Sequence, residues 1–186
     1  MLTSGPPVNI HGTMTLSVSL SPAHVDISAP RNAADWADAA RLLADYSAWL
    51  EYASGYEDPN ITRECGAETS PLSLRYVTPN GALVLARFAG HAVGITAVKR
   101  LSGEVAELKH VYLRPSARGL GLAPQMIEAA IDAARRLRVK RLVLETHNEI
   151  MPAAVKLYRR YGFEEIADYT SLSEVIPGVI AMQLVL

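Results

Sequence analysis

Val111-Tyr-Leu-Arg-Pro-Ser-Ala-Arg-Gly-Leu-Gly-Leu-Ala-Pro124 is the stretch that decides the fold, because it joins a strand end, a turn and a helix start. Pro115 stops a run of strand-forming residues, and the turn that follows contains two glycines. Pro124 has no backbone N–H and is tolerated only in the first turn of a helix, so the helix is predicted to begin near residues 119–121. The stretch therefore predicts a strand–turn–helix unit in the middle of the chain.

The start of this helix is a predicted anion-binding site. The first amides of a helix have no intrahelical acceptor, and the amides of residues 118–122 hold that position. Gly119 and Gly121 let a phosphate approach the backbone, and Arg118 adds a positive charge to the helix dipole. The same spacing also occurs in plain strand-to-helix turns, so both interpretations stay open on this stretch alone. It matches neither the dinucleotide fingerprint nor the P-loop.

Helical and strand patterns alternate along the rest of the chain without internal repeats. Helices are predicted over residues 33–54, 120–137 and 152–160, with a short helix inside the loops of residues 55–80. Strands are predicted over residues 24–28, 82–88, 92–98, 105–114, 141–146, 163–167 and 179–186. The buried face of the second long helix is expected to consist of Leu122, Met126, Ala130, Ala134 and Leu137. The pattern predicts an α/β (α+β) layer built on a mixed sheet.

Composition excludes several classes of protein. The chain has 186 residues, with 18 basic and 19 acidic side chains and a formal net charge of −1, which argues against sequence-blind nucleic-acid binding. Cys65 is the only cysteine, which excludes intramolecular disulfides and cysteine-based zinc sites. We expect residues 1–22 to be a flexible leader or a short extra strand, and residues 23–186 to form one domain. No signal peptide and no apolar run of membrane-spanning length is found, so we expect a cytoplasmic protein without a membrane partner.

Three segments resemble the GNAT superfamily of acetyl-CoA-dependent N-acetyltransferases, in its single-domain bacterial type. They are Ala106-Glu-Leu-Lys-His-Val-Tyr-Leu-Arg-Pro-Ser-Ala-Arg-Gly-Leu-Gly-Leu-Ala123, Leu144-Glu-Thr146 and Ala153-Ala-Val-Lys-Leu-Tyr-Arg-Arg-Tyr-Gly-Phe163. The resemblance implies a mixed, mainly antiparallel central sheet of about seven strands flanked by helices, with splayed fourth and fifth strands. This chain departs from the family at Ser116, where Gln or Arg often begins the loop, and at Met151, where many members carry Asn.

The resemblance also implies where acetyl-CoA binds as co-substrate. The pantetheine arm would lie between the splayed strands and meet the backbone groups of Val111, Tyr112 and Leu113. One amide in that stretch would polarise the thioester carbonyl. The pyrophosphate would lie on the loop residues Ala117, Arg118, Gly119, Leu120, Gly121 and Leu122.

Tyr158 is similar to the family's catalytic tyrosine, which protonates the departing thiolate. The alternative is that it only packs on the sheet, as we expect of Tyr161. Glu107 matches the base of some relatives, but it is equally suited to a salt bridge with Lys109 on the same strand face.

Other polar residues near these positions are weaker candidates. Glu145 is the rival base at the end of the fifth long strand, although a salt-bridged carboxylate is the more common role there. His110 and His147 are expected to be structural or rim residues, and no pattern predicts a metal site. The five cations within residues 135–141 indicate a solvated helix end rather than a nucleic-acid patch.

The sequence says least about which residues would bind the acceptor substrate. Tyr46, Trp49, Tyr52 and Tyr56 fall on one helical side, and an aromatic stripe of this kind is usually core. The implied function is acetyl transfer from acetyl-CoA to a primary amine of a small molecule, such as an amino acid, by direct attack in a ternary complex. The alternative is a non-catalytic acyl-CoA-binding or regulatory module of the same fold. A homodimer is compatible with either.

Overall fold

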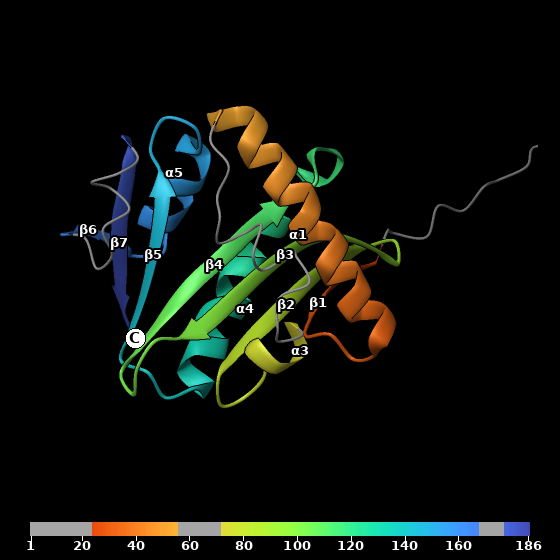
Figure 1. Ribbon diagram of the computed structural model, residues 1–186, viewed down its shortest axis with the longest axis horizontal. Coiled ribbons are helices and arrows are strands. Elements are labelled where there is room, and N and C mark those ends of the chain that lie inside the picture. Colours follow the sequence, from red (N-terminus) through yellow and green to blue (C-terminus); the bar gives the residue numbers. More distant parts are fainter. Residues whose placement is uncertain (1–23, 56–71, 168–176) are drawn as a thin grey trace, which may run out of the picture.

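A computed structural model of the chain describes residues 24–55, 72–167 and 177–186, and the expectation for residues 1–22 lies outside them. One seven-stranded sheet with the order β1-β2-β3-β4-β5-β7-β6 forms the centre (Figure 1). The strands are β1 (Val25–Ser28), β2 (Gly81–Phe88), β3 (His91–Arg100), β4 (Val105–Leu113), β5 (Arg141–His147), β6 (Glu164–Ile166) and β7 (Val179–Val185). All neighbours are antiparallel except β4 and β5, which are parallel. The predicted mixed, mainly antiparallel sheet is confirmed.

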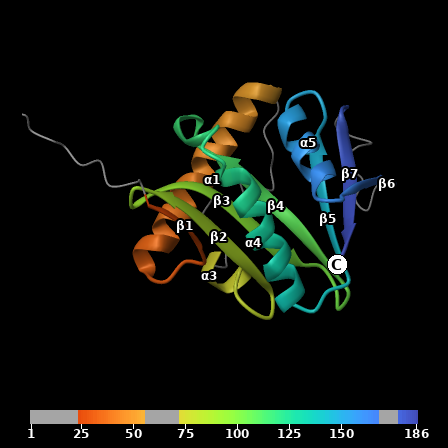
Figure 2. The ribbon, with the colours of Figure 1, turned by 180° about the vertical axis from the view of Figure 1, so that it is seen from behind.

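Helices cover both faces of this sheet. α1 (Ala33–Ser54) and the short α3 (Leu72–Arg75) lie on one face, and α4 (Leu122–Arg136) and α5 (Pro152–Arg160) lie on the other (Figures 1 and 2). We call these the α1 face and the α4 face. No helix within the described ranges is long and apolar enough to cross a membrane.

Local signals set both ends of α1 at the predicted residues. The side chain of Asn32 accepts a hydrogen bond from the Asp35 amide at 3.0 Å, and the Asp35 carboxylate accepts one from the Arg31 amide at 2.6 Å. The first bond satisfies an amide that a helix start leaves without an acceptor, and the second joins the first turn of α1 to the residue before its N-cap. At the other end Gly55 adopts the left-handed region (φ 65°) and donates its N–H to the carbonyl of Glu51.

The helix after the glycine turn begins two residues later than predicted. Gly121 is the N-cap of α4 and lies in the left-handed region, so helical backbone geometry starts only at Leu122. The predicted buried face is confirmed, since Leu122, Met126, Ala130, Ala134 and Leu137 are all buried. Pro124 occupies the first turn, where its missing N–H costs no hydrogen bond.

The core is divided into one apolar cluster on each face. On the α1 face, Leu42 and Leu43 pack against Leu85 and Ile95. On the α4 face, the core residues of α4 pack with those of β5 and α5, including Tyr158. Each amphipathic helix thus buries its apolar side against the sheet, α4 mainly on β2 and β3 and α5 on β5.

The fourth and fifth strands separate after a short paired stretch, as predicted. β4 and β5 pair only where residues 105–107 meet residues 141–143. Beyond this point the strands diverge (Figure 1), and β4 continues to Leu113 with β3 as its only strand neighbour among the described residues. The sheet therefore has an opening between β4 and β5, which we call the split.

A β-bulge lies in β4 beside the split. Ala97 of β3 pairs with Lys109, whereas Ile95 pairs with Tyr112, so Thr96 faces two residues of β4. The extra residue puts His110 in the left-handed region at φ 56°. A bulge re-aims side chains, and here His110 and Tyr112 both lie on the α1 face.

Candidate active site

The glycine turn forms a loop between β4 and α4. A 3₁₀ turn, η1 (Pro115–Ala117), comes first, and its Pro115 carbonyl accepts the Arg118 amide at 3.2 Å. The amide of Arg118 is thus bonded within η1, so it has a partner although that partner lies outside α4. Gly119 and Gly121 both have positive φ, 81° and 71°, and their amides have no backbone acceptor among the described residues. The loop keeps the geometry of an anion site at a helix start.

A cleft of about 510 Å³ opens between this loop and α5, on the α4 face that is turned to the viewer in Figure 2. Five of its lining residues belong to the predicted coenzyme set: Leu113, Arg118, Gly119, Gly121 and Leu122. The other two predicted loop residues do not line the cleft: Ala117 is buried, and Leu120 is exposed to solvent. The cleft thus brings together the end of β4 and the start of α4, as a coenzyme that binds to both requires.

Two cations of α5 also line the cleft, and the sequence analysis missed them. Lys156 and Arg160 are four residues apart and lie on the same side of the helix. Neither forms an ion pair with another described residue, unlike Arg159, which pairs with Glu165 on another side of the helix. The sequence shows that these two cations are four residues apart, but it does not show which side of α5 faces the glycine loop.

The two arginines near the loop have different partners. Arg118 lines the cleft, donates from Nε to the Leu113 carbonyl at 3.2 Å, and lies with its guanidinium 5.5 Å from the Trp49 ring centroid. Arg114 instead forms an ion pair with Asp45 of α1 at 2.7 Å. The charge of Arg114 is therefore balanced within the protein, whereas Arg118 lies at the mouth of the cleft.

Tyr158 lies in the core of the α4 face, 5% exposed, with its ring 5.7 Å from that of Phe163. Burial raises the pKa of its phenol well above the usual 10, and the nearby phenol of Tyr46 raises the pKa further. Tyr158 therefore carries its proton at every working pH. Because Tyr46 belongs to α1, the two phenols approach from opposite faces of the sheet.

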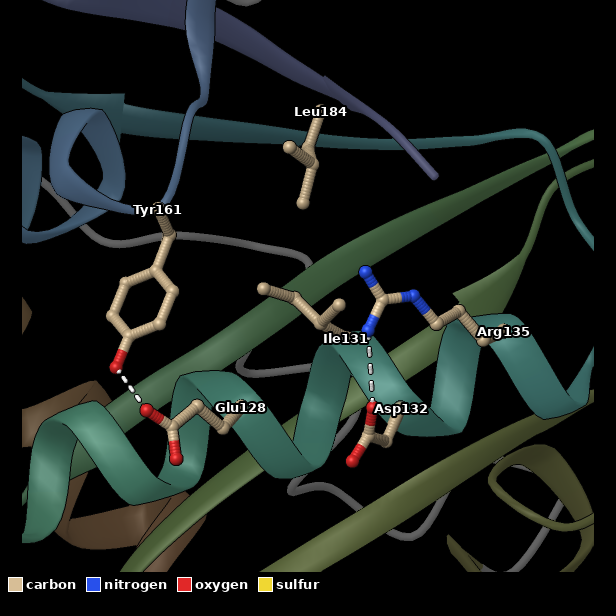
Figure 3. A pocket seen from close by; sticks show the side chains of 6 residues that line it. All are labelled: Glu128, Ile131, Asp132, Arg135, Tyr161 and Leu184. Atoms are coloured by element: carbon tan, nitrogen blue, oxygen red, sulfur yellow. Dashed lines mark hydrogen bonds and ion pairs between the residues drawn. The ribbon is translucent and has the colours of Figure 1, made fainter.

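The Tyr161 hydroxyl is directed at Glu128 of α4, as expected of a structural residue (Figure 3). Its hydroxyl donates to Glu128 Oε1 at 2.7 Å and lies 3.2 Å from the Pro124 carbonyl. Burial and the Glu128 carboxylate raise the pKa of this phenol. A depression of about 330 Å³ between α4 and β7 is lined by Glu128, Ile131, Asp132, Arg135, Tyr161 and Leu184.

The two candidate bases lie on the α1 face, on either side of the split. Glu107 forms an ion pair with Lys109 at 3.6 Å, and only 12% of the Glu107 side chain is exposed. The predicted salt bridge thus exists. Glu145 is on β5, two residues beyond the Val143 that pairs with Glu107. Since alternate residues share a face, Glu145 lies on the same face as Glu107.

The histidines differ in environment. His147 is half-buried, accepts the amides of Glu149 and Ile150 at Nδ1, and packs against Gly178, which fits the expected structural role. His110 is 6% exposed and therefore is not a rim residue. Its Nε2 lies 3.1 Å from the Tyr76 hydroxyl.

Aromatic side chains surround His110 on the α1 face. Tyr46 stacks on Trp49 at 6.2 Å between ring centroids and packs on Tyr112 at 5.6 Å. The predicted stripe is thus core at Tyr46 and Trp49, but Tyr52 is 90% exposed, because α1 extends past the sheet at this end. Tyr56 lies outside the described residues. Within those residues, no group of three acidic, histidine or cysteine side chains could hold a metal ion.

Comparison with known proteins decides the family. The model of the acetyltransferase (GNAT) family matches residues 40–163, which contain the split, the glycine loop and Tyr158. The chain belongs to the GNAT family. It is 30% identical to an uncharacterised N-acetyltransferase of Schizosaccharomyces pombe, with 89% of this chain and 97% of the relative covered.

Solved structures of GNAT proteins share the fold. A putative acyl-CoA N-acyltransferase from Klebsiella pneumoniae is 25% identical, with a TM-score of 0.64 over 88% of this chain and 97% of that one. PaiA N-acetyltransferase from Thermoplasma acidophilum, solved with coenzyme A, has a TM-score of 0.64 at 16% identity over 88% of this chain and 99% of that one. The GNAT family performs acyl transfer, and this chain has its sheet, split and loop.

Proposed function

We propose that this GNAT protein transfers the acetyl group of acetyl-CoA to a primary amine of a small molecule by direct attack in a ternary complex. The observation that carries the proposal is the position of the split next to the cleft. Both open at the end of β4, so one extended molecule can place its phosphates on the loop and its thioester at the split. The coenzyme A bound by the PaiA protein of the same fold supports this class of co-substrate.

The coenzyme would be held mainly by backbone groups and a few cations. The amides of Gly119 and Gly121, with Arg118, would bind the pyrophosphate, while Lys156 and Arg160 would contribute charge from the opposite wall. Backbone groups of Val111, Tyr112 and Leu113 on the unpaired edge of β4 would meet the pantetheine and polarise the thioester carbonyl. The chain would thus hold and orient an already activated acyl group.

In the transfer step, the amine nitrogen forms a bond to the carbonyl carbon and the bond from carbon to sulfur breaks. The departing thiolate takes the proton of the Tyr158 hydroxyl, which burial keeps protonated until then. An alkylamine with a pKa of about 10 arrives as ammonium, so it loses one proton to Glu107 or Glu145, directly or through water, before it attacks. Its nitrogen loses a second proton to water once the bond to the carbonyl carbon has formed. Tyr158 then recovers its proton from solvent as the products leave.

Thiol release tests this function. Purified protein is mixed with acetyl-CoA and a panel of amines, amino acids, aminoglycoside antibiotics and peptides, and free thiol is measured with a chromogenic reagent. A blank without acetyl-CoA corrects for Cys65, the only thiol of the chain. Amine-dependent thiol release supports the proposal. Tight acetyl-CoA binding in calorimetry without release from any amine would instead assign the chain to the non-catalytic acyl-CoA-binding module.

A further inference from the structure

His110 has a positive φ, which few residues other than glycine adopt. Three described residues other than glycine have positive φ, namely Ala89 at 50°, His110 at 56° and Arg138 at 56°. Ala89 lies in the turn between β2 and β3, and Arg138 follows α4, whereas His110 lies within a strand. Glycine would adopt this φ without steric cost. A strained residue persists where its side chain does something that cheaper residues cannot.

The imidazole of His110 is held on two sides. Tyr76, which follows α3, places its hydroxyl 3.1 Å from Nε2, and its ring meets the imidazole edge-on at a centroid distance of 6.2 Å. On the other side Tyr46 of α1 makes a second edge-on contact, also at 6.2 Å. Both tyrosines are buried, so the three rings form a continuous packed chain from α3 to α1.

Tyr46 connects this chain of rings to the split. It packs on Tyr112 of β4, one of the residues whose backbone is proposed to meet the thioester. Its phenol is also an electrostatic neighbour of Tyr158, which comes from the α4 face. Any change in the position of Tyr46 thus acts on both the proposed acid and the strand that holds the acyl group.

We propose that His110 is a positioning residue, whose imidazole fixes the ring of Tyr46 at the split beside Tyr158. The backbone strain is retained because the bulge aims the imidazole at both Tyr46 and Tyr76, and asparagine or glycine would remove the edge-on ring contact to Tyr46. The catalytic consequence rests on the proposed acetyl transfer, but the placement of Tyr46 does not. The two statements are therefore tested separately.

The placement is tested by fluorine NMR on protein labelled with 3-fluorotyrosine. The chain has 8 tyrosines, and the Tyr46 resonance is assigned by its loss in Tyr46→Phe.

His110→Asn keeps a residue that tolerates positive φ and removes the ring. Ala89→Asn is the matched control, since it relieves similar strain in a turn between β2 and β3. We expect the Tyr46 resonance to shift or broaden in His110→Asn and to stay unchanged in Ala89→Asn. An unmoved resonance in His110→Asn overturns the proposal.

The catalytic consequence is read from the kinetic constants of the same variants. His110→Asn is expected to lower kcat by about 10- to 100-fold with an unchanged KM for acetyl-CoA, because a misplaced group affects the chemical step and not the distant phosphates. Ala89→Asn should keep both constants.

His110→Gly, also unstrained at this φ, is the second variant should asparagine prevent folding. A kcat within twofold of the original, or failure of both variants to fold, overturns the positioning role. If the unmodified protein transfers no acetyl group, the proposed function fails, and the fluorine measurement still decides the placement.

Discussion

The Tyr161 hydroxyl donates a hydrogen bond to Glu128 Oε1 at 2.7 Å, and this bond ties the end of α5 to α4 (Figure 3). The same hydroxyl lies 3.2 Å from the carbonyl of Pro124, a residue that lines the cleft between the glycine loop and α5. The two walls of the cleft, α5 and the start of α4, are therefore held relative to each other by contacts of Tyr161. Tyr161 does not line the cleft itself, but it can in this way determine the shape of the cleft.

Removing this bond should weaken coenzyme binding and leave the chemistry intact. Tyr161→Phe loses a hydrogen bond to a charged acceptor, worth about 1.5–3 kcal/mol in general and less here, because Glu128 can turn to solvent. We expect the KM for acetyl-CoA to rise about threefold to tenfold with kcat within twofold, measured by steady-state kinetics. Tyr52→Phe on the exposed end of α1 is the control. A rise in KM of equal size in both variants would show that the bond does not matter.

Tyr158→Phe tests the proposed acid. The variant keeps the buried ring and its contact with Phe163, so calorimetry should give an unchanged affinity for acetyl-CoA. Without the hydroxyl the thiolate leaves unprotonated, and kcat should fall about 10²- to 10⁴-fold. Because burial raises the pKa of this phenol, the rate of the unmodified protein should not decline near pH 10 through ionisation of Tyr158. An unchanged kcat in the variant would mean that Tyr158 only packs in the core.

The cations of α5 offer a test of the cleft with a control on the same helix. Lys156→Ala and Arg160→Ala should each raise the KM for acetyl-CoA, by about fivefold to tenfold at low salt, because a cation close to a phosphate is lost. Arg159→Ala, whose side chain pairs with Glu165 outside the cleft, should leave KM unchanged. The difference between the variants should shrink as salt is added. Equal effects at all three positions would indicate a general charge effect and not binding in this cleft.

Local sequence signals predict much of this fold, and the site only in part. Asn32 and Gly55 act on their own helix ends, so the bounds of α1 are readable without tertiary information. The bulge at His110 depends instead on how β4 registers with β3, and no glycine or proline marks it. The ion pair of Arg114 with Asp45 joins residues 69 positions apart, which no local pattern reveals. The strand–turn–helix unit was predictable because Pro115, the two glycines and Pro124 lie in one short segment.

Asp35 allows a prediction on stability that does not depend on function. Its carboxylate accepts the Arg31 amide and pairs with the buried Arg87 at 2.6 Å, and these contacts hold its pKa below the ordinary value of 3.8. A lowered folded-state pKa contributes stability that is complete above the unfolded value and is lost as the pH falls below 3.8 through the folded value. Asp35→Asn should therefore destabilise the protein by about 2–3 kcal/mol at neutral pH, since it leaves a buried cation with a weaker partner.

The pH dependence of this loss separates the charge from the helix cap. Urea unfolding should show the full deficit of Asp35→Asn at pH 7, and a deficit that narrows steadily as the pH falls below 3.8. Asp38→Asn removes a half-buried carboxylate that pairs with the exposed Arg41 on the same helix, and should cost less than about 1 kcal/mol. A deficit in Asp35→Asn that stays constant with pH would assign the effect to the cap alone.

The two candidate bases can be distinguished by their pH profiles. Glu107→Gln removes a carboxylate that already pairs with Lys109, and Glu145→Gln removes its counterpart across the split. Because more of the acceptor amine is protonated at lower pH, loss of the true base should lower kcat/KM most at the acid end of the profile. We expect this from Glu107→Gln, with a loss of about 10²-fold near pH 6, and a nearly parallel profile from Glu145→Gln. The reverse pattern would identify Glu145 of β5 as the base. Two unchanged profiles would assign proton removal to water.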